Sequence, residues 1–342
     1  MKPKSHLLRN LVFGILIIIF VWYIFSHHEE FSKFIEALRQ GSWLWLVVAG
    51  ITQALYYTVY TFMTKSAFKT VHLHRKFIEL VPLVFGSLFV NVLAPTGGQS
   101  GTILYADDAA RRKESSPKAI IASVITTIVG YMAFSFILVF SLVYLKRAGL
   151  LNNYEIIGSI IFIFPTIIPG ILIFTSYRFP KFTLKVTNWV YRLVKSFTKL
   201  IHRPSKISPA WPTNIARELT EAAHLVRGNK KQLIITLFIA LIAHAVSIVS
   251  LFVIFLAFDY KIHYGALIAG YAFGEVARVI SPQPEGIGVV EVVMVVIFTS
   301  FGVPPIQATA ISIVFRGLNF WAPLGLGFAL LKTTKSFSGK SA

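Results

Sequence analysis

The chain contains no cysteine and is poor in charged residues, above all in acidic ones. The absence of cysteine among its 342 residues excludes disulfide bonds and thiol chemistry. Charged residues make up only 14% of the chain, and 33 lysines and arginines stand against 14 acidic residues, for a formal net charge of +19. No nucleic-acid-binding motif accompanies this excess. Positive charge on the cytoplasmic side of a membrane explains it more simply, so phospholipid, and not nucleic acid, is the expected partner.

The sequence also lacks the patterns on which enzymes and metal proteins depend. It has no nucleophile elbow, no phosphate-binding glycine loop before a lysine, and no zinc-ligand spacing. His244 stands alone in an apolar run, where we expect a packed polar residue. Asp107 and Asp108, followed by Arg111 and Arg112, are expected to form a solvated helix end rather than a metal site. We therefore expect no cofactor, no metal and no catalytic residues.

What the sequence does contain is long apolar runs. Hydrophobic residues make up 55% of the chain, and the mean hydropathy is +0.70. Several runs exceed the roughly 18 residues needed to cross a bilayer. The sequence predicts one all-α polytopic membrane domain, 1–342, with about six full spans, the first of them uncleaved. The candidate spans are 10–25, 43–64, 77–94, 117–145, 154–176, 231–258, 264–280 and 308–331, with shorter helices at 98–110 and 287–301.

Two related breaks interrupt these apolar runs. The first contains Pro95, Gly97, Gly98 and Gly101, and the second contains Pro284, Gly286 and Gly288. Broken helices in corresponding halves of a membrane protein indicate a transport site. Unwound backbone at membrane depth persists only where protein or a water-filled cavity surrounds it. Because a 13-residue helix covers about 20 Å and the hydrocarbon core is about 30 Å thick, each break is predicted to turn a re-entrant hairpin.

The distribution of lysine and arginine predicts how these hairpins are oriented. The basic segments 65–76 and 111–118 indicate that the first hairpin opens to the cytoplasm, while the uncharged turn 302–307 indicates that the second opens to the outside. Both chain termini are then cytoplasmic. Pro95 and Pro117 are 22 residues apart, and Pro284 and Pro305 are 21 apart. The units 43–145 and 231–331 therefore form a predicted inverted repeat, the architecture of alternating-access carriers.

The segment 178–230 separates the two predicted repeats. Phe182, Val186, Trp189 and Leu193 fall at helical spacing, with lysines and arginines on the other faces. This pattern predicts a basic amphipathic helix in the membrane interface on the cytoplasmic side. The helix either recruits anionic lipid or is an ordinary interfacial connector.

Ionisable residues in apolar segments are candidates for substrate binding, because charge at membrane depth is costly. We expect the substrate at Arg278, Glu285, Glu291, Arg316 and Gln99. Arginine suits a lipid phosphate and a carboxylate suits an ammonium group. The alternatives are structural: Glu275 and Arg278 neutralise each other, or Arg316 pairs with Glu291 as a lock between hairpin and last span.

The segment from Ser281 to Leu331 resembles the C-terminal signature of one family. The matching residues include Pro284, Gly286, Gly288, Glu291, Pro304, Pro305, Arg316 and Trp321, and Pro95, Thr96, Gly97, Gly98 and Gly101 match its other hairpin. The family is the flippase-like transmembrane domain of lysylphosphatidylglycerol synthases, the multiple peptide resistance factor proteins. Glu285 stands where that family more often has glycine.

The resemblance implies a bacterial inner-membrane protein that moves aminoacylated phosphatidylglycerol to the outer leaflet, and so a link to antimicrobial peptide resistance. The full synthases add a soluble transferase domain, and the residues for that reaction are not found in this sequence. Three hypotheses follow: a lipid flippase, an accessory subunit of a separately encoded synthase or transferase, or a lysyltransferase. The sequence leaves open the headgroup, the coupling and whether the chain forms a homo-oligomer.

Overall fold

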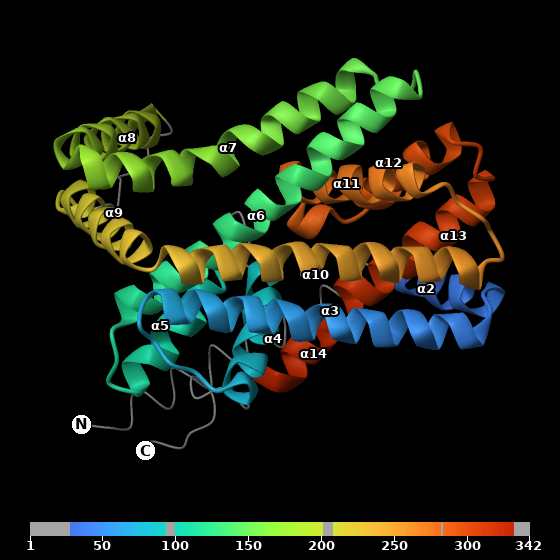
Figure 1. Ribbon diagram of the computed structural model, residues 1–342, viewed down its shortest axis with the longest axis horizontal. Coiled ribbons are helices and arrows are strands. Elements are labelled where there is room, and N and C mark those ends of the chain that lie inside the picture. The colour runs from blue at the N-terminus through green and yellow to red at the C-terminus, as the bar shows by residue number, and fades with distance from the viewer. Residues whose placement is uncertain (1–27, 94–99, 201–207, 282, 332–342) are drawn as a thin grey trace.

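The computed structural model describes residues 28–93, 100–200, 208–281 and 283–331, and within these ranges it is helical, with no strand. The helices are α2 (His28–Gln40), α3 (Trp43–Thr70), α4 (Phe77–Leu93), α5 (Thr102–Arg111), α6 (Ser116–Arg147), α7 (Asn153–Arg178), α8 (Pro180–Leu200), α9 (Trp211–Gly228), α10 (Lys230–Ala257), α11 (Tyr264–Ile280), η1 (Pro284–Gly286), α12 (Val289–Ser300), α13 (Pro305–Arg316), η2 (Gly317–Trp321) and α14 (Ala322–Leu331). Figure 1 shows their arrangement.

Helices α3 and α10 form an antiparallel pair along the long axis of the molecule (Figure 1). The Ser42 amide donates to the Ala257 carbonyl at one end (2.7 Å), and the Asn229 side chain donates to the Thr70 carbonyl at the other (3.0 Å). Between these ends, the hydroxyls of Ser66 and Thr236 are 2.7 Å apart. Small and hydroxyl side chains allow two apolar helices to approach closely and to hydrogen-bond without help from water.

Two helix pairs pack around this central pair. In one, α4 and α5 flank the first break; in the other, α11 and α12 flank the second. Helix α4 packs against α14 while α11 packs against α6, and α5 packs against α6 while α12 packs against α13. Each helix pair has its own apolar core: Phe68, Phe89, Leu104 and Ile125 are buried around the first, and Phe255, Tyr271, Phe298 and Ile311 around the second.

The first break is closed by close packing and one polar contact. The Asn91 side-chain oxygen accepts a hydrogen bond from the Gly101 amide at 2.7 Å. A Cβ atom on Gly101 would lie 2.4 Å from the Ser87 carbonyl oxygen, so only glycine lets α5 begin this close to α4. Pro95, Gly97, Gly98 and Gln99 lie outside the described residues.

The last helical stretch, from Pro305 to Leu331, changes its hydrogen-bonding pattern at its centre. Gly317–Trp321 form a π-helical segment. Such segments are found mostly as single turns and often at functional sites, because they redirect side chains and free a carbonyl group. Here the Tyr57 hydroxyl of α3 donates to the Asn319 carbonyl at 2.7 Å.

Most expected helices are present. Among the described residues, four helices are long and apolar enough to cross a membrane: Trp43–Thr70, Ser116–Arg147, Lys230–Ala257 and Pro305–Leu331. Helix α7, at Asn153–Arg178, agrees with the expected span 154–176. The stretch between the expected spans 10–25 and 43–64 contains α2, which packs on α13. The predicted first span, 10–25, lies outside the described residues.

Candidate functional site

A cavity lies where α4, the helix before the first break, approaches η1 in the second break. It has a volume of about 110 Å³ and is enclosed by α3, α4, η1, α11 and the last helical stretch. Val92, near the end of α4, and Glu285, inside the second break, line the same cavity. The lining residues are Tyr56, Tyr57, Tyr60, Leu88, Val92, Glu275, Arg278, Glu285, Arg316, Asn319, Phe320, Pro323 and Leu324. The structure thus brings three of the expected substrate residues, Arg278, Glu285 and Arg316, to one cavity.

Arg278 is the centre of the ionic cluster in this cavity. It is bonded to two carboxylates, Glu275 one helical turn before it and Glu285 in the second break, each at 2.9 Å. Its side chain keeps 27% of its surface exposed. The expected neutralisation of Glu275 by Arg278 is confirmed, but Arg278 also reaches across to the break. It therefore connects a regular helix, α11, to the irregular backbone that follows it.

Arg316 approaches the second break from the last helical stretch. Its Nε donates to Glu291 at 3.0 Å, and its Nη2 donates to the Glu285 carbonyl at 2.9 Å. The guanidinium also lies over the Phe320 ring, 4.8 Å from its centroid. The expected pair between Arg316 and Glu291 is confirmed. Glu291 is not among the cavity-lining residues, so it contacts the cavity only through Arg316.

The backbone of the second break is held in conformations that most residues avoid. Glu285 has φ 51° and ψ 20°, and Gly286 and Gly288 have φ of 68° and 76°. A left-handed conformation costs a residue other than glycine about 1–2 kcal/mol. Pro284 begins the short helical turn, and a Cβ on Gly286 would lie 2.8 Å from the Arg278 Cα. Glu285 occupies this conformation while both of its arginine contacts hold it in place.

The charges around the cavity are of both signs. Glu275, Glu285 and Glu291 supply three carboxylates, and Arg278 and Arg316 supply two guanidinium groups, for a formal net charge of −1 if all are ionised. Charged groups this far from water are stable only when paired. A ligand that carries a phosphate and an ammonium group could replace existing partners on both sides, so no buried charge would be left unpaired.

Sequence reasoning missed the aromatic side of the cavity. Tyr56, Tyr57 and Tyr60 of α3 line it, opposite the ionic cluster of α11 and η1. The signal was present, since three tyrosines fall within five residues of an otherwise apolar span. Hydroxyl groups at membrane depth need partners just as charges do, and the spacing of Tyr56 and Tyr60 places them on one helical face.

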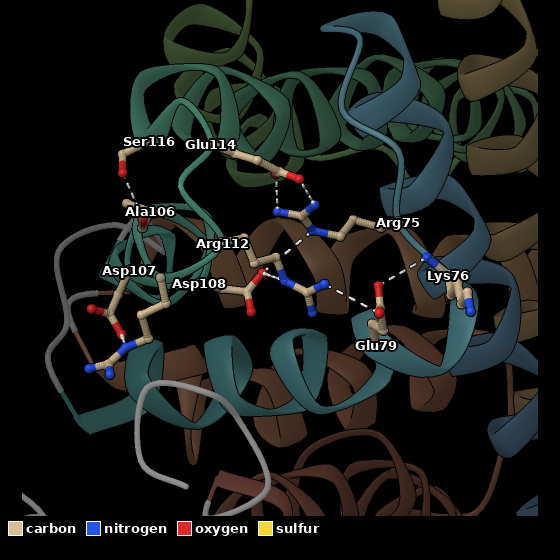
Figure 2. Close-up of polar contacts among 10 residues, drawn as sticks. Arg75, Lys76, Glu79, Ala106, Asp107, Asp108, Arg112, Glu114 and Ser116 are labelled. Carbon is tan, nitrogen blue, oxygen red and sulfur yellow. Dashed lines mark hydrogen bonds and ion pairs between the residues drawn. The ribbon is translucent and has the colours of Figure 1, made fainter. Parts of the chain in front are cut away.

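A second ionic cluster lies at the loop ends of α4 and α5, as Figure 2 shows. Asp108 is 2% exposed; its carboxylate is 3.4 Å from Arg75 Nε and 2.9 Å from Arg112 Nε. Arg75 also donates to Glu114 at 2.8 Å, and Arg112 reaches Glu79 at 3.2 Å. The expectation of a solvated helix end is wrong for Asp108, because Arg75 comes from a loop that sequence reasoning did not place beside it. It holds for the exposed pair of Asp107 and Arg111.

Hydrogen bonding within this second cluster affects the titration of Glu114. The hydrogen bond from Arg75 and the charge of its guanidinium hold the pKa of the Glu114 carboxyl below its usual range, although partial burial opposes the shift. The carboxylate therefore stays ionised and bonded at neutral pH. This cluster ties the loop before α4 to the loop after α5.

The described residues contain no group of three or more side chains placed to hold a metal ion. His244 is packed as expected: one ring nitrogen is 2.7 Å from the Tyr271 hydroxyl and the other is 3.2 Å from the Gly130 carbonyl. These contacts fix the ring between α6 and α11.

The fold and the cavity define a multi-pass α-helical membrane protein with charged groups gathered at the second helix break. The chain belongs to the family of the lysylphosphatidylglycerol synthase transmembrane region, whose model matches residues 11–327. A UPF0104 membrane protein of Methanocaldococcus jannaschii is 23% identical over 97% of each chain. Another from Pyrococcus horikoshii is 22% identical over 96% of each chain. The family membership confirms the resemblance carried by the two Pro-Gly breaks.

Proposed function

We propose that this protein is a lipid flippase-like carrier that moves a headgroup between leaflets through the cavity between the two breaks. The observation that carries the proposal is the cavity itself. It lies between α4, which precedes the first break, and the second break, and it presents paired arginines and carboxylates inside an apolar helical bundle. Charges are maintained at such positions when they serve a polar substrate or ion. The lipid's hydrocarbon chains would stay in the membrane while the headgroup passes.

An inverted repeat accounts for the packing around the α3–α10 pair. Exchanging α3 with α10, α4 and α5 with α11 and α12, and α6 with the last helical stretch maps each of the main contacts onto another. The contact of α4 with α14 maps onto that of α11 with α6, and the contact of α5 with α6 onto that of α12 with α13. We therefore propose repeats at about 43–145 and 231–331, two re-entrant hairpins, and access to the cavity from alternate sides.

The substrate we propose has a phosphate-containing headgroup with an amino group, of which aminoacylated phosphatidylglycerol is the example given by the family. Arg278 and Arg316 would bind the phosphate, and Glu275 and Glu285 the ammonium group. Pockets that bind small ligands usually measure about 300–1,000 Å³. The observed cavity, at about 110 Å³, is smaller than this, so the headgroup must enter a wider conformation than this one.

The proposed location is a cell membrane, with both termini on the cytoplasmic side. The excess of lysine and arginine in 65–76 and 111–118 supports this orientation.

The test is leaflet exchange in liposomes. The purified protein is reconstituted, and exchange of headgroup-labelled phosphatidylglycerol and of its lysyl form is followed against empty vesicles. Arg278→Gln removes a charged hydrogen-bond donor from the cavity. Since such a bond contributes about 1.5–3 kcal/mol, we expect a tenfold or greater loss of exchange. Arg111→Gln is the matched control, because Arg111 is half-exposed, forms an ion pair with the exposed Asp107 and does not line the cavity.

The outcomes separate the rival functions. Exchange that Arg278→Gln abolishes and Arg111→Gln preserves supports a carrier. Folded wild-type protein that exchanges neither lipid overturns the proposal and favours the accessory-subunit hypothesis, which requires a stable partner enzyme.

A further inference from the structure

A second cavity lies beside the headgroup cavity, on the membrane-facing side of α3. It has a volume of about 390 Å³ and lies between α3, α4 and the last helical stretch. Its walls are mostly apolar, with Val81 and Phe85 from α4 and Leu318 and Leu326 from the last stretch. Leu326, at its mouth, is 50% exposed, so the cavity is a groove that opens on the outer surface of the bundle.

The groove contains one polar side chain whose burial is unexplained. Gln53 is 3% exposed, and neither its amide oxygen nor its amide nitrogen makes a hydrogen bond within the described structure. The nearby Tyr57 hydroxyl donates its proton to the Asn319 carbonyl instead. An unpartnered buried amide costs roughly 1–3 kcal/mol. A leucine of similar volume would avoid this cost, so the amide points to a ligand.

The groove and the headgroup cavity share two lining residues, Tyr57 and Pro323. A molecule that reaches from one to the other must be polar at one end and apolar at the other. In a membrane, what meets an apolar groove that opens sideways is the hydrocarbon chain of a lipid. Gln53 lies on α3 one helical turn before Tyr57, so its amide is near the junction of the groove and the headgroup cavity.

We propose that the groove binds one acyl chain of the transported phospholipid, and that Gln53 donates a hydrogen bond to the ester carbonyl of that chain. This inference rests on the proposed function for the identity of the headgroup. It adds where the chain lies and how the linkage is recognised. The groove and the headgroup cavity together would then recognise a whole diacyl lipid and not a free headgroup.

Glycine 50 offers a way to fill the groove without disturbing the fold. Gly50 lines the groove, and a Cβ built on it has no neighbour within 4 Å. Gly50→Leu should therefore occupy the groove and also favour the helix, since leucine is the better helix former. Gly325→Leu is the matched control: a Cβ on Gly325 also meets nothing within 4 Å, and Gly325 does not line the groove.

The experiment measures binding of dioleoyl phosphatidylglycerol to delipidated protein in detergent by native mass spectrometry. We expect Gly50→Leu to weaken binding at least tenfold and Gly325→Leu to leave it within twofold. Gln53→Leu should weaken binding about three- to tenfold, the range for one hydrogen bond. It should lose this effect with an ether-linked analogue, which has no ester carbonyl.

Thermal unfolding of the lipid-free variants adds a second readout. If Gln53 serves the ligand, Gln53→Leu raises the unfolding temperature while it weakens lipid binding. If the amide only supports the fold, the temperature falls and binding is unchanged, which overturns the inference. Unchanged binding in Gly50→Leu overturns it as well.

Leaflet exchange on the same variants separates the two proposals. If Gly50→Leu exchanges lipid at the wild-type rate and binds it unchanged, the acyl-chain groove is rejected and the carrier proposal stands. If the protein exchanges no lipid but its lipid binding depends on Gly50 and Gln53, the carrier proposal is rejected and the groove stands as a lipid-binding site.

Discussion

Glu285 combines a costly backbone conformation with a charged side chain at the cavity. Its φ of 51° favours glycine, whereas its carboxylate holds Arg278 at 2.9 Å. The cost of the backbone is thus offset by the ion pair and by the Arg316 bond to the Glu285 carbonyl. The Glu285 side chain thus contributes an ion pair, while its backbone conformation lowers stability.

Two substitutions at Glu285 separate these contributions. Glu285→Ala removes the carboxylate and keeps the unfavourable φ, whereas Glu285→Gly removes both. We expect Glu285→Gly to unfold at the higher temperature of the two, by a difference that corresponds to about 1 kcal/mol. Thermal unfolding in one detergent measures this. Equal stability of the two variants would mean that the backbone at 285 is not strained.

Glu114 predicts how stability changes at acidic pH. Its folded-state pKa lies below the unfolded value of about 4.3, chiefly because of the hydrogen bond from Arg75. A depressed carboxyl pKa stabilises the fold above the unfolded pKa, and this stability is lost as pH falls through the folded pKa. Glu114→Gln should therefore lower the unfolding temperature at pH 7. On acidification below about pH 4, the unfolding temperature of this variant should fall less than that of the wild type.

The control for this prediction is Asp107→Asn, which alters an exposed pair in the same loop region. Exposed pairs contribute little, so its pH dependence should follow the wild type. A Glu114→Gln curve that runs parallel to the wild type over pH 3–7 would contradict the assignment.

Among the helices, the approach of α5 to α4 depends on one glycine. A Cβ on Gly101 would lie 2.4 Å from the Ser87 carbonyl oxygen and 2.6 Å from the Ser87 Cβ. Both are within well-packed structure, so Gly101→Ala must push α5 away from α4, and overpacking of this kind costs about 1–3 kcal/mol. We expect a lower unfolding temperature and weaker leaflet exchange, because α4 forms one wall of the cavity.

Gly130→Ala in α6 provides the comparison. The nearest side-chain atom to a Cβ on Gly130 is Met63 Cε at 4.0 Å, an ordinary contact. Alanine in mid-helix is favoured over glycine by roughly 0.5–1 kcal/mol, so this variant should be as stable as the wild type or more so. A Gly101→Ala protein that behaves like Gly130→Ala would show that α4 and α5 are not in close contact.

Sequence alone predicted the helices better than the contacts between them. Apolar runs gave α3, α6, α10 and α11 to within a few residues, except that α3 continues to Thr70. Helix α2 was missed because it contains no apolar run long enough to cross a membrane, although Phe31, Phe34 and Leu38 fall at helical spacing. Arg278 with Glu275 was predictable because the two are three residues apart. Arg75 with Asp108 was not, since only the packing of two loops brings them together.

At the scale of the whole molecule, the cavity lies where elements from both halves of the sequence meet. Val92 comes from the first helix pair, and Arg278 and Glu285 from the second. Neither half alone would enclose a cavity, and the antiparallel α3–α10 pair is what holds the halves at this distance. In an inverted repeat, a movement that opens the cavity to one side of the membrane can close it to the other. The orientation of each helix pair in the membrane is therefore the property to test.

Single cysteines provide that test, because the cysteine-free chain supplies a clean background. Lys76 and Lys113 flank the first helix pair, Lys261 and Ile306 flank the second, and all four are exposed. If each pair is re-entrant, its two flanking cysteines react from the same side of the membrane. If the repeats are inverted, Lys261→Cys and Ile306→Cys react with an impermeant maleimide in intact cells, while Lys76→Cys and Lys113→Cys react only after permeabilisation. Detergent-solubilised protein, in which all four should react, controls for buried thiols. Reaction of all four from one side would reject inversion, and opposite reactivity within a pair would reject the re-entrant hairpin.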